Sequence, residues 1–138
     1  MAGPSAAPWP EHPDVAIVKR ACIAARKGDR TVAEELFVDD AMLHIPGTNP
    51  LAGHYEGREA FFDFYDKARE LSAGTLRVYL HDVVANGRHA FFIENFIASR
   101  DGRNLDSRDV TVCHVIDGRI ATATRLYTKI QIHDEFWS

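Results

Sequence analysis

The 138-residue sequence has only two cysteines and no long apolar run, and each shortage excludes a class of protein. Cys22 and Cys113 are far apart in the chain with no other thiol near either, which argues against a disulfide framework and a zinc knuckle. We interpret both as small buried hydrophobic residues in a reducing cell. No apolar run approaches the roughly 20 residues that cross a bilayer, so no membrane contact is predicted.

Positive charge is also scarce. The 16 Lys and Arg residues are scattered among 20 Asp and Glu, giving a net charge of −4 and no basic stripe to neutralise phosphates. A nucleic-acid partner is therefore excluded. The seven histidines form no metal-binding spacing, and there is no glycine-rich phosphate loop and no Gly-x-Ser-x-Gly motif. We therefore predict no metal, no cofactor and no serine hydrolase.

What is present is the composition of one globular domain, at 15.5 kDa and 46% apolar residues. The first ten residues contain three prolines and lack the basic start and apolar stretch of a signal peptide. We expect a loose arm at residues 1–13, a single domain at 14–138, and a cytoplasmic location.

Three helices are predicted in the first half of the chain. Apolar residues recur at helical spacing from Asp14 to Gly28, Thr31 can cap a short helix through Phe37, and residues 58–71 are again helical. A strand of about five residues should follow Asp39-Asp40 and stop at Pro46-Gly47. Residues 47–57, rich in Gly and Pro, are predicted to be a loop.

The second half is predicted to be β-structure. Runs of β-branched and aromatic residues at 75–85, 89–99, 105–116 and 119–130 are separated by Asn86-Gly87, Asp101-Gly102 and Asp117-Gly118, which favour hairpin turns. This order indicates an α+β fold in which helices cover one face of a mostly antiparallel sheet. The strand at 89–99 is apolar on both faces, so its outer face should meet a second subunit in a homodimer.

Several short segments together resemble a known family. They are Phe37-Val-Asp-Asp-Ala, His44-Ile-Pro-Gly, Asn49-Pro-Leu-Ala-Gly, Tyr55-Glu-Gly-Arg, His81-Asp82, Leu105-Asp106, Asp117-Gly-Arg-Ile and Asp134-Glu-Phe-Trp. Their order and spacing from residue 14 to the end are similar to SnoaL-like proteins of the nuclear transport factor 2-like superfamily, which are related to ketosteroid isomerase and polyketide cyclases. The resemblance implies a cone-shaped, usually dimeric protein with an apolar pocket between helices and concave sheet. The superfamily includes isomerases, cyclases, dehydratases, epoxide hydrolases and proteins without catalysis, so this fold does not fix a function.

The family's catalytic residues are mostly replaced. By resemblance, the ketosteroid isomerase base falls on Ile45 and its oxyanion tyrosine on Ala21, whereas the second oxyanion donor, a protonated aspartate, matches Asp109. The acid/base His and Asp of the SnoaL-type cyclases fall on Thr111 and Arg125. Neither proton relay can therefore be carried over intact.

Strand alternation, together with the resemblance, turns Asp109, Glu94 and Arg125 toward the concave face. Charges in an apolar interior are costly unless paired, so we expect Arg125 to lie between the two carboxylates. Asp109 would then act as acid or base, with Arg125 as its partner or as an anion clamp. The alternatives are a structural salt bridge and, for Glu94, a one-residue bulge that turns it outward.

Two further sets complete the predicted site. His44 could carry protons beside the pocket mouth, or could be a structural histidine. Tyr55 could close the entrance, or could pack on the helix at 58–71. The predicted substrate-binding residues are Tyr55, Phe61, Tyr65, Phe92, Phe96, Thr111 and Tyr127.

The sequence thus predicts an enzyme that needs no cofactor and that isomerises, cyclises, dehydrates or opens an epoxide in a small apolar, polyketide-like molecule. Two alternatives stay open: a non-catalytic protein that binds a small molecule, and a dimeric scaffold that works through its convex face.

Overall fold

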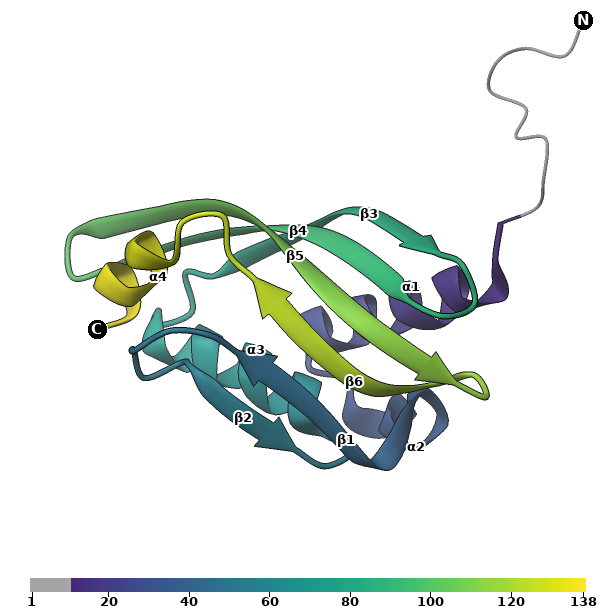
Figure 1. The fold of residues 1–138 in the computed structure, drawn as a ribbon. Coiled ribbons are helices and arrows are strands. Elements are labelled where there is room, and N and C mark those ends of the chain that lie inside the picture. The colour runs from purple at the N-terminus through teal and green to yellow at the C-terminus, as the bar shows by residue number, and fades with distance from the viewer. Residues whose placement is uncertain (1–10) are drawn as a thin grey trace, which may run out of the picture.

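Six strands form one curved sheet in the computed structural model, which describes residues 11–138 (Figure 1). They are β1 (Phe37–Ile45), β2 (Gly53–Glu56), β3 (Arg77–Ala85), β4 (Ala90–Arg100), β5 (Arg103–Ile116) and β6 (Arg119–Leu126). Their order across the sheet is β2-β1-β6-β5-β4-β3. Neighbours pair antiparallel except β1 and β6, which are parallel. The predicted α+β class with a mostly antiparallel sheet is confirmed.

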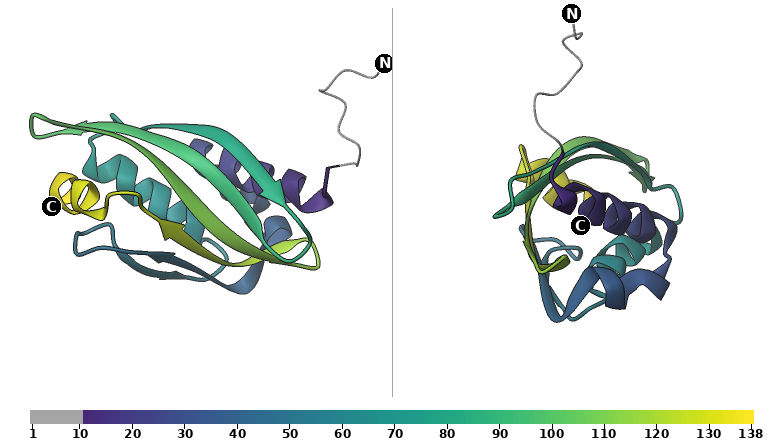
Figure 2. Two further views of the ribbon diagram at one scale, coloured as in Figure 1. Left: turned by 45° about the horizontal axis from the view of Figure 1, so that its top comes forward. Right: turned by 90° about the vertical axis from the view of Figure 1, so that its right-hand side faces the viewer.

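The helices lie inside the curve of the sheet and at its ends. They are α1 (Pro13–Lys27), a 3-10 turn (Arg30–Val32), α2 (Ala33–Leu36), α3 (Ala60–Leu71) and α4 (Ile130–Trp137). The end-on view in Figure 2 shows the sheet wrapping around α1 and α3. In Figure 1, α4 lies at the end of the sheet where β4 turns into β5. The interior therefore has three walls: the concave sheet, the two long helices, and α4.

Local sequence signals explain the first helix. The His12 ring accepts a hydrogen bond from the Asp14 amide, Pro13 occupies the first turn, and Gly28 ends the helix in the left-handed conformation at φ 74°. The Asp-Gly turns behave as predicted, because Asp101-Gly102 and Asp117-Gly118 adopt positive φ at both positions and join antiparallel strands.

Three details of the prediction were wrong. The second helix ends at Leu36, and β1 starts at Phe37 and runs for nine residues because it pairs with β6, a partner distant in sequence. The predicted loop at 47–57 contains β2, which pairs with β1. The last strand ends at Leu126, and residues 130–137 form α4, for which no helix was predicted.

Of the arm predicted at residues 1–13, the first ten residues lie outside the described part of the chain, and Pro13 already belongs to α1. Among residues 11–138, no helix is both long enough and apolar enough to cross a membrane.

Candidate functional site

Arg125 lies between two carboxylates, as the sequence predicts. Its Nη1 donates to Glu94 Oε1 at 3.0 Å, and its Nη2 lies 3.7 Å from Asp109 Oδ2. All three residues are at most 2% exposed. Burial opposes the charge of Arg125, but the negative potential of Tyr127, Glu94 and other neighbours outweighs it and raises the pKa of the guanidinium above its ordinary value. Arg125 is therefore a permanent cation in the protein interior.

Strand register brings these three side chains together. Glu94 on β4 and Asp109 on β5 are direct cross-strand partners, and Thr111 pairs with Arg125 on β6. Alternate residues of each strand face inward, so one face of three adjacent strands carries the whole set. The bulge considered for Glu94 lies in β3 instead, between Leu80 and Asp82, and Glu94 keeps its inward direction.

Helix α3 adds a fourth polar group. The Tyr65 hydroxyl donates to Glu94 Oε1 at 2.5 Å, so this oxygen accepts from both Tyr65 and Arg125. Burial raises the pKa of Tyr65 well above its usual range, and the charge of Glu94 raises it further. The phenol stays protonated and can only donate to the carboxylate. Tyr65, predicted as a wall of the pocket, is thus part of the polar network.

Two residues of the network escaped the sequence reasoning, His133 on α4 and Ser107 on β5. His133 Nε2 lies 2.8 Å from Ser107 Oγ and 3.2 Å from Asp109 Oδ2, and the Ser107 hydroxyl also donates to Asp109. The signals were present: Ile130, His133 and Trp137 have helical spacing, and Ser107 alternates with Asp109 on one strand face. The sequence analysis uses Asp134-Glu-Phe-Trp only as evidence of the family resemblance, and His133 lies immediately before this segment.

Aromatic rings surround the guanidinium. Its central carbon lies 4.2 Å from the Phe96 ring centroid, 5.4 Å from that of Phe64 and 5.7 Å from that of Tyr127. Such rings attract a cation through their faces, which lowers the cost of burying it. Tyr127 also stacks on His133, with centroids 3.6 Å apart and planes 15° from parallel. Burial raises the pKa of Tyr127 to about 12, although Arg125 opposes this effect.

Several buried N–H or ring nitrogen atoms of this region have no hydrogen-bond partner among residues 11–138. They are Arg125 Nε and Nη2, His133 Nδ1 and Trp137 Nε1. Buried polar atoms are nearly always paired, and an unpaired one is costly. Within the network, Arg125 and His133 thus keep nitrogen atoms that are free to pair with a polar group.

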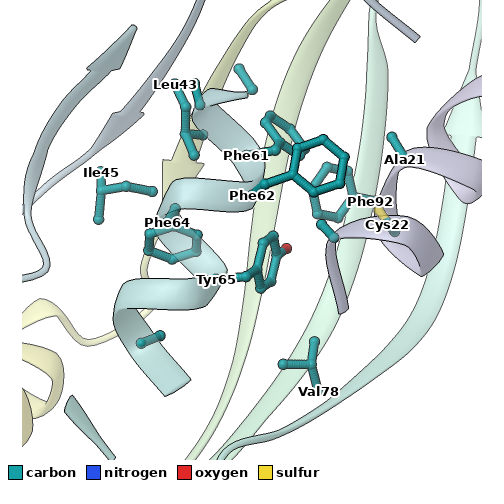
Figure 3. Close-up of a cluster of buried hydrophobic side chains, with 14 of the residues drawn as sticks. Ala21, Cys22, Leu43, Ile45, Phe61, Phe62, Phe64, Tyr65, Val78 and Phe92 are labelled. Atoms are coloured by element: carbon teal, nitrogen blue, oxygen red, sulfur yellow. The ribbon is translucent and has the colours of Figure 1, made fainter. Parts of the chain in front are cut away.

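The interior between α3 and the sheet is closely packed. Figure 3 shows Phe61, Phe64 and Tyr65 of α3 in the space between this helix and the sheet, where Phe92 of β4 also lies. Ring centroids lie 6.2 Å apart for Phe61 and Phe92 and 5.7 Å apart for Tyr65 and Phe96. These residues, expected to bind substrate, contact one another and form part of the core.

Two predicted residues lie away from the network. His44 alternates with the buried Leu43 and Ile45 and therefore faces outward, where its ring lies 4.5 Å from that of His54. His44 also lines a surface groove together with Arg125, so its predicted role as a proton carrier beside the pocket mouth stays a prediction. The Tyr55 hydroxyl donates to the Leu51 carbonyl at 2.6 Å, and its ring packs on Phe64 of α3, the second of the two placements considered.

Two surface grooves border the network. One, of about 360 Å³, is lined by His44, Pro46, Thr124, Arg125, Leu126, Tyr127 and Ile130. The other, of about 310 Å³, is lined by Asp106, Ser107, Arg108, Thr128, Lys129 and Ile132. The segment from Tyr127 to Lys129 contributes to both grooves. This segment covers the charged cluster on one side and faces the solvent in the grooves on the other.

Comparison with known proteins identifies the family of the chain. The model of the SnoaL-like domain matches residues 18–123, most of the chain. The chain belongs to the SnoaL-like family. This SnoaL-like chain is 28% identical to the uncharacterized protein Rv0034 of Mycobacterium tuberculosis, covering 91% of this chain and 96% of that protein.

Solved structures share the fold of this SnoaL-like chain. Bal32a, from a soil-derived mobile gene cassette, is 28% identical with a TM-score of 0.82, covering 91% of this chain and 96% of Bal32a. IdmH of Streptomyces antibioticus, a proposed polyketide cyclase, has a TM-score of 0.69 at 18% identity, covering 88% and 96%. At that identity the likeness to IdmH shows the shared fold alone.

Proposed function

We propose that this SnoaL-like protein is an acid/base enzyme that uses its own side chains to move a proton on a small, largely apolar molecule. The observation that carries the proposal is the buried cluster in which Arg125 lies between Glu94 and Asp109. Isomerisation, ring closure, loss of water and epoxide opening all require a proton to leave one atom and reach another. A buried carboxylate beside a fixed cation is suited to such steps.

The two carboxylates have different surroundings, which suggests different roles. Glu94 accepts hydrogen bonds from both Tyr65 and Arg125 at Oε1. Asp109 lies farther from Arg125 and contacts Ser107 and His133, both able to exchange protons. We assign proton transfer to Asp109 and its neighbours. Arg125 Nε and Nη2 are unpaired donors that can stabilise negative charge developing on a substrate oxygen.

The substrate class follows from the walls. The rings of Phe96, Phe64 and Tyr127 around Arg125 suit a flat apolar molecule that carries a carbonyl or other polar oxygen. Polyketide-type intermediates have this chemistry, and the fold shared with IdmH, a proposed polyketide cyclase, is consistent with it.

Two probes of general proton transfer test the proposal. 5-Nitrobenzisoxazole loses its C–H proton to a base while its N–O bond breaks, releasing a coloured phenolate, and 2-tetralone exchanges its α-protons in D₂O. We expect the wild-type protein to accelerate at least one reaction over buffer, and Asp109→Asn to lower that rate about a hundredfold or more while remaining folded. Asp106→Asn, on the same strand but exposed, is the matched control. Wild-type rates equal to buffer with both probes would contradict the proposal.

The second candidate is a non-catalytic binding protein, and the close packing of Phe61, Phe92, Tyr65 and Phe96 favours it because ring contacts occupy much of the interior. In this case the ion pair holds strands together. Asp109→Asn would then change the binding of 2-tetralone, measured by ligand-observed NMR, or the stability, with no rate to lose.

A further inference from the structure

We infer that the general base of the site is His133 Nδ1, and that Asp109 and Ser107 orient the imidazole. The inference rests on the proposed acid/base function. In this inference His133 of α4, and not the Asp109 carboxylate of β5, accepts the proton. Three observations carry it: the contacts of Nε2, the unpaired Nδ1, and the stacking of Tyr127 on the ring.

The contacts of Nε2 identify the tautomer. A serine hydroxyl has a single proton, and Ser107 donates it to the Asp109 carboxylate. Toward His133, 2.8 Å away, Ser107 Oγ can therefore only accept a hydrogen bond. His133 Nε2 must then carry the proton, and the same N–H is directed close to Asp109 Oδ2 at 3.2 Å. In the neutral ring this leaves Nδ1 without a proton.

The bare Nδ1 is the nitrogen that has no hydrogen-bond partner among residues 11–138. A bare Nδ1 has a lone pair that can accept a proton, whereas a buried N–H without an acceptor is costly. The arrangement therefore matches the logic of a catalytic His–carboxylate pair, in which the carboxylate fixes one ring nitrogen and leaves the other to accept a proton.

A purely structural role explains this geometry poorly. Helix α4 is already fastened at its end by Arg100, which donates to the Phe136 carbonyl at 3.1 Å, and by Arg103, which donates to the Glu135 carbonyl. Asp134 joins the helix to the loop after β1 by accepting from the Thr48 amide at 2.8 Å. With these contacts in place, a histidine that served only the fold would gain nothing from an unpaired nitrogen.

The surroundings also favour the charged ring that a base must become. When Nδ1 takes a proton from a substrate C–H or O–H, the ring becomes an imidazolium whose Nε2–H faces the Asp109 carboxylate. Tyr127 stacks on one face of the ring and can stabilise the cation. The proton then returns to another atom of the product or leaves for solvent, so the step is balanced. Tyr127 lines the groove of about 360 Å³ and Ser107 lines the groove of about 310 Å³, so both neighbours of the imidazole border places where a ligand can lie.

The tautomer can be measured without any substrate. Long-range ¹H–¹⁵N spectra of the ¹⁵N-labelled full-length protein distinguish a protonated Nε2 from a protonated Nδ1, with His133→Gln used to assign the signals. We expect Nε2–H and a bare Nδ1. A ring protonated only at Nδ1 would overturn the inference whatever the activity.

The base role is tested by two substitutions with the probe that the wild type turns over. His133→Gln keeps an N–H near the place of Nε2, so it preserves the contact with Asp109, but it has no basic nitrogen. We expect the rate to fall about 10²–10⁴-fold. His133→Ala removes the ring, and added imidazole should restore part of its rate. His114→Gln, an exposed histidine on β5, is the control.

The outcomes separate the two proposals. A His133→Gln protein with the wild-type rate, while Asp109→Asn has lost it, overturns the inference and leaves the acid/base function standing. Wild-type rates equal to buffer contradict the acid/base function and the base role together, even if the tautomer is the expected one. Loss in His133→Gln with imidazole rescue of His133→Ala supports both.

Discussion

Arg125 is a full positive charge placed among phenylalanine rings, and its neighbours make this possible. The guanidinium stacks over Phe96 and faces Glu94 and Asp109, so the cost of removing it from water is offset by two opposite charges and by ring faces. The same arrangement makes the residue hard to replace, because each carboxylate depends on the cation.

Replacing Arg125 by Met should therefore lower the free energy of unfolding by about 3–5 kcal/mol, since two buried carboxylates lose their partner. Urea denaturation monitored by circular dichroism measures the change. Arg20→Met is the matched control, because Arg20 forms an exposed pair with Glu35 and should leave stability nearly unchanged. Equal effects of the two substitutions would show that the buried pair does not stabilise the fold.

Among the helices and strands, α4 is the element that supplies His133 to the site. It is an eight-residue helix, too short to be stable alone, and it depends on its contacts with the rest of the chain. Asp134 accepts hydrogen bonds from the Thr48 amide and the Asn49 side chain, both at 2.8 Å, which hold the pKa of Asp134 below its ordinary value. Gly47 makes the contact possible: its φ is +120°, and a Cβ there would lie 2.6 Å from Asp134 Oδ1.

We expect Asp134→Ala and Gly47→Ala to loosen α4 and to speed amide hydrogen exchange in residues 130–137. Because the pKa of Asp134 is lowered in the folded state, the stabilisation is present above the ordinary aspartate pKa and is lost as the pH falls below it. Asp40→Ala, an exposed aspartate of β1, is the control. Unchanged exchange in both variants would mean that the other contacts hold α4 by themselves.

For the whole molecule, the outer face of the sheet is the surface through which the sequence predicts a homodimer. Large apolar side chains are more than a third exposed on β3 and β4: Tyr79, Val84, Phe91 and Ile97. The homodimer expected from the sequence stays a prediction, and this face is where a second copy would pack.

Phe91→Asp should convert a dimer into a monomer, measured by light scattering after size exclusion, because a charge would be buried at the centre of the contact. Ile23→Asp on α1 is the matched control, because Ile23 is 40% exposed and Phe91 is 39% exposed. A wild-type mass equal to the 15.5 kDa chain would refute the dimer.

The chain's own pattern determined the fold class and the Asp-Gly turns, because turn chemistry and strand alternation act within a few residues. The inward direction of Glu94, Asp109 and Arg125 followed from the same alternation once the family resemblance had indicated which face is concave. Only the tertiary structure decided the rest. Pairing of β1 with β6 set the length of β1, and the packing of α4 brought His133 to Asp109, 24 residues earlier in the chain. Such contacts depend on how distant segments meet in space, and no local pattern encodes that distance.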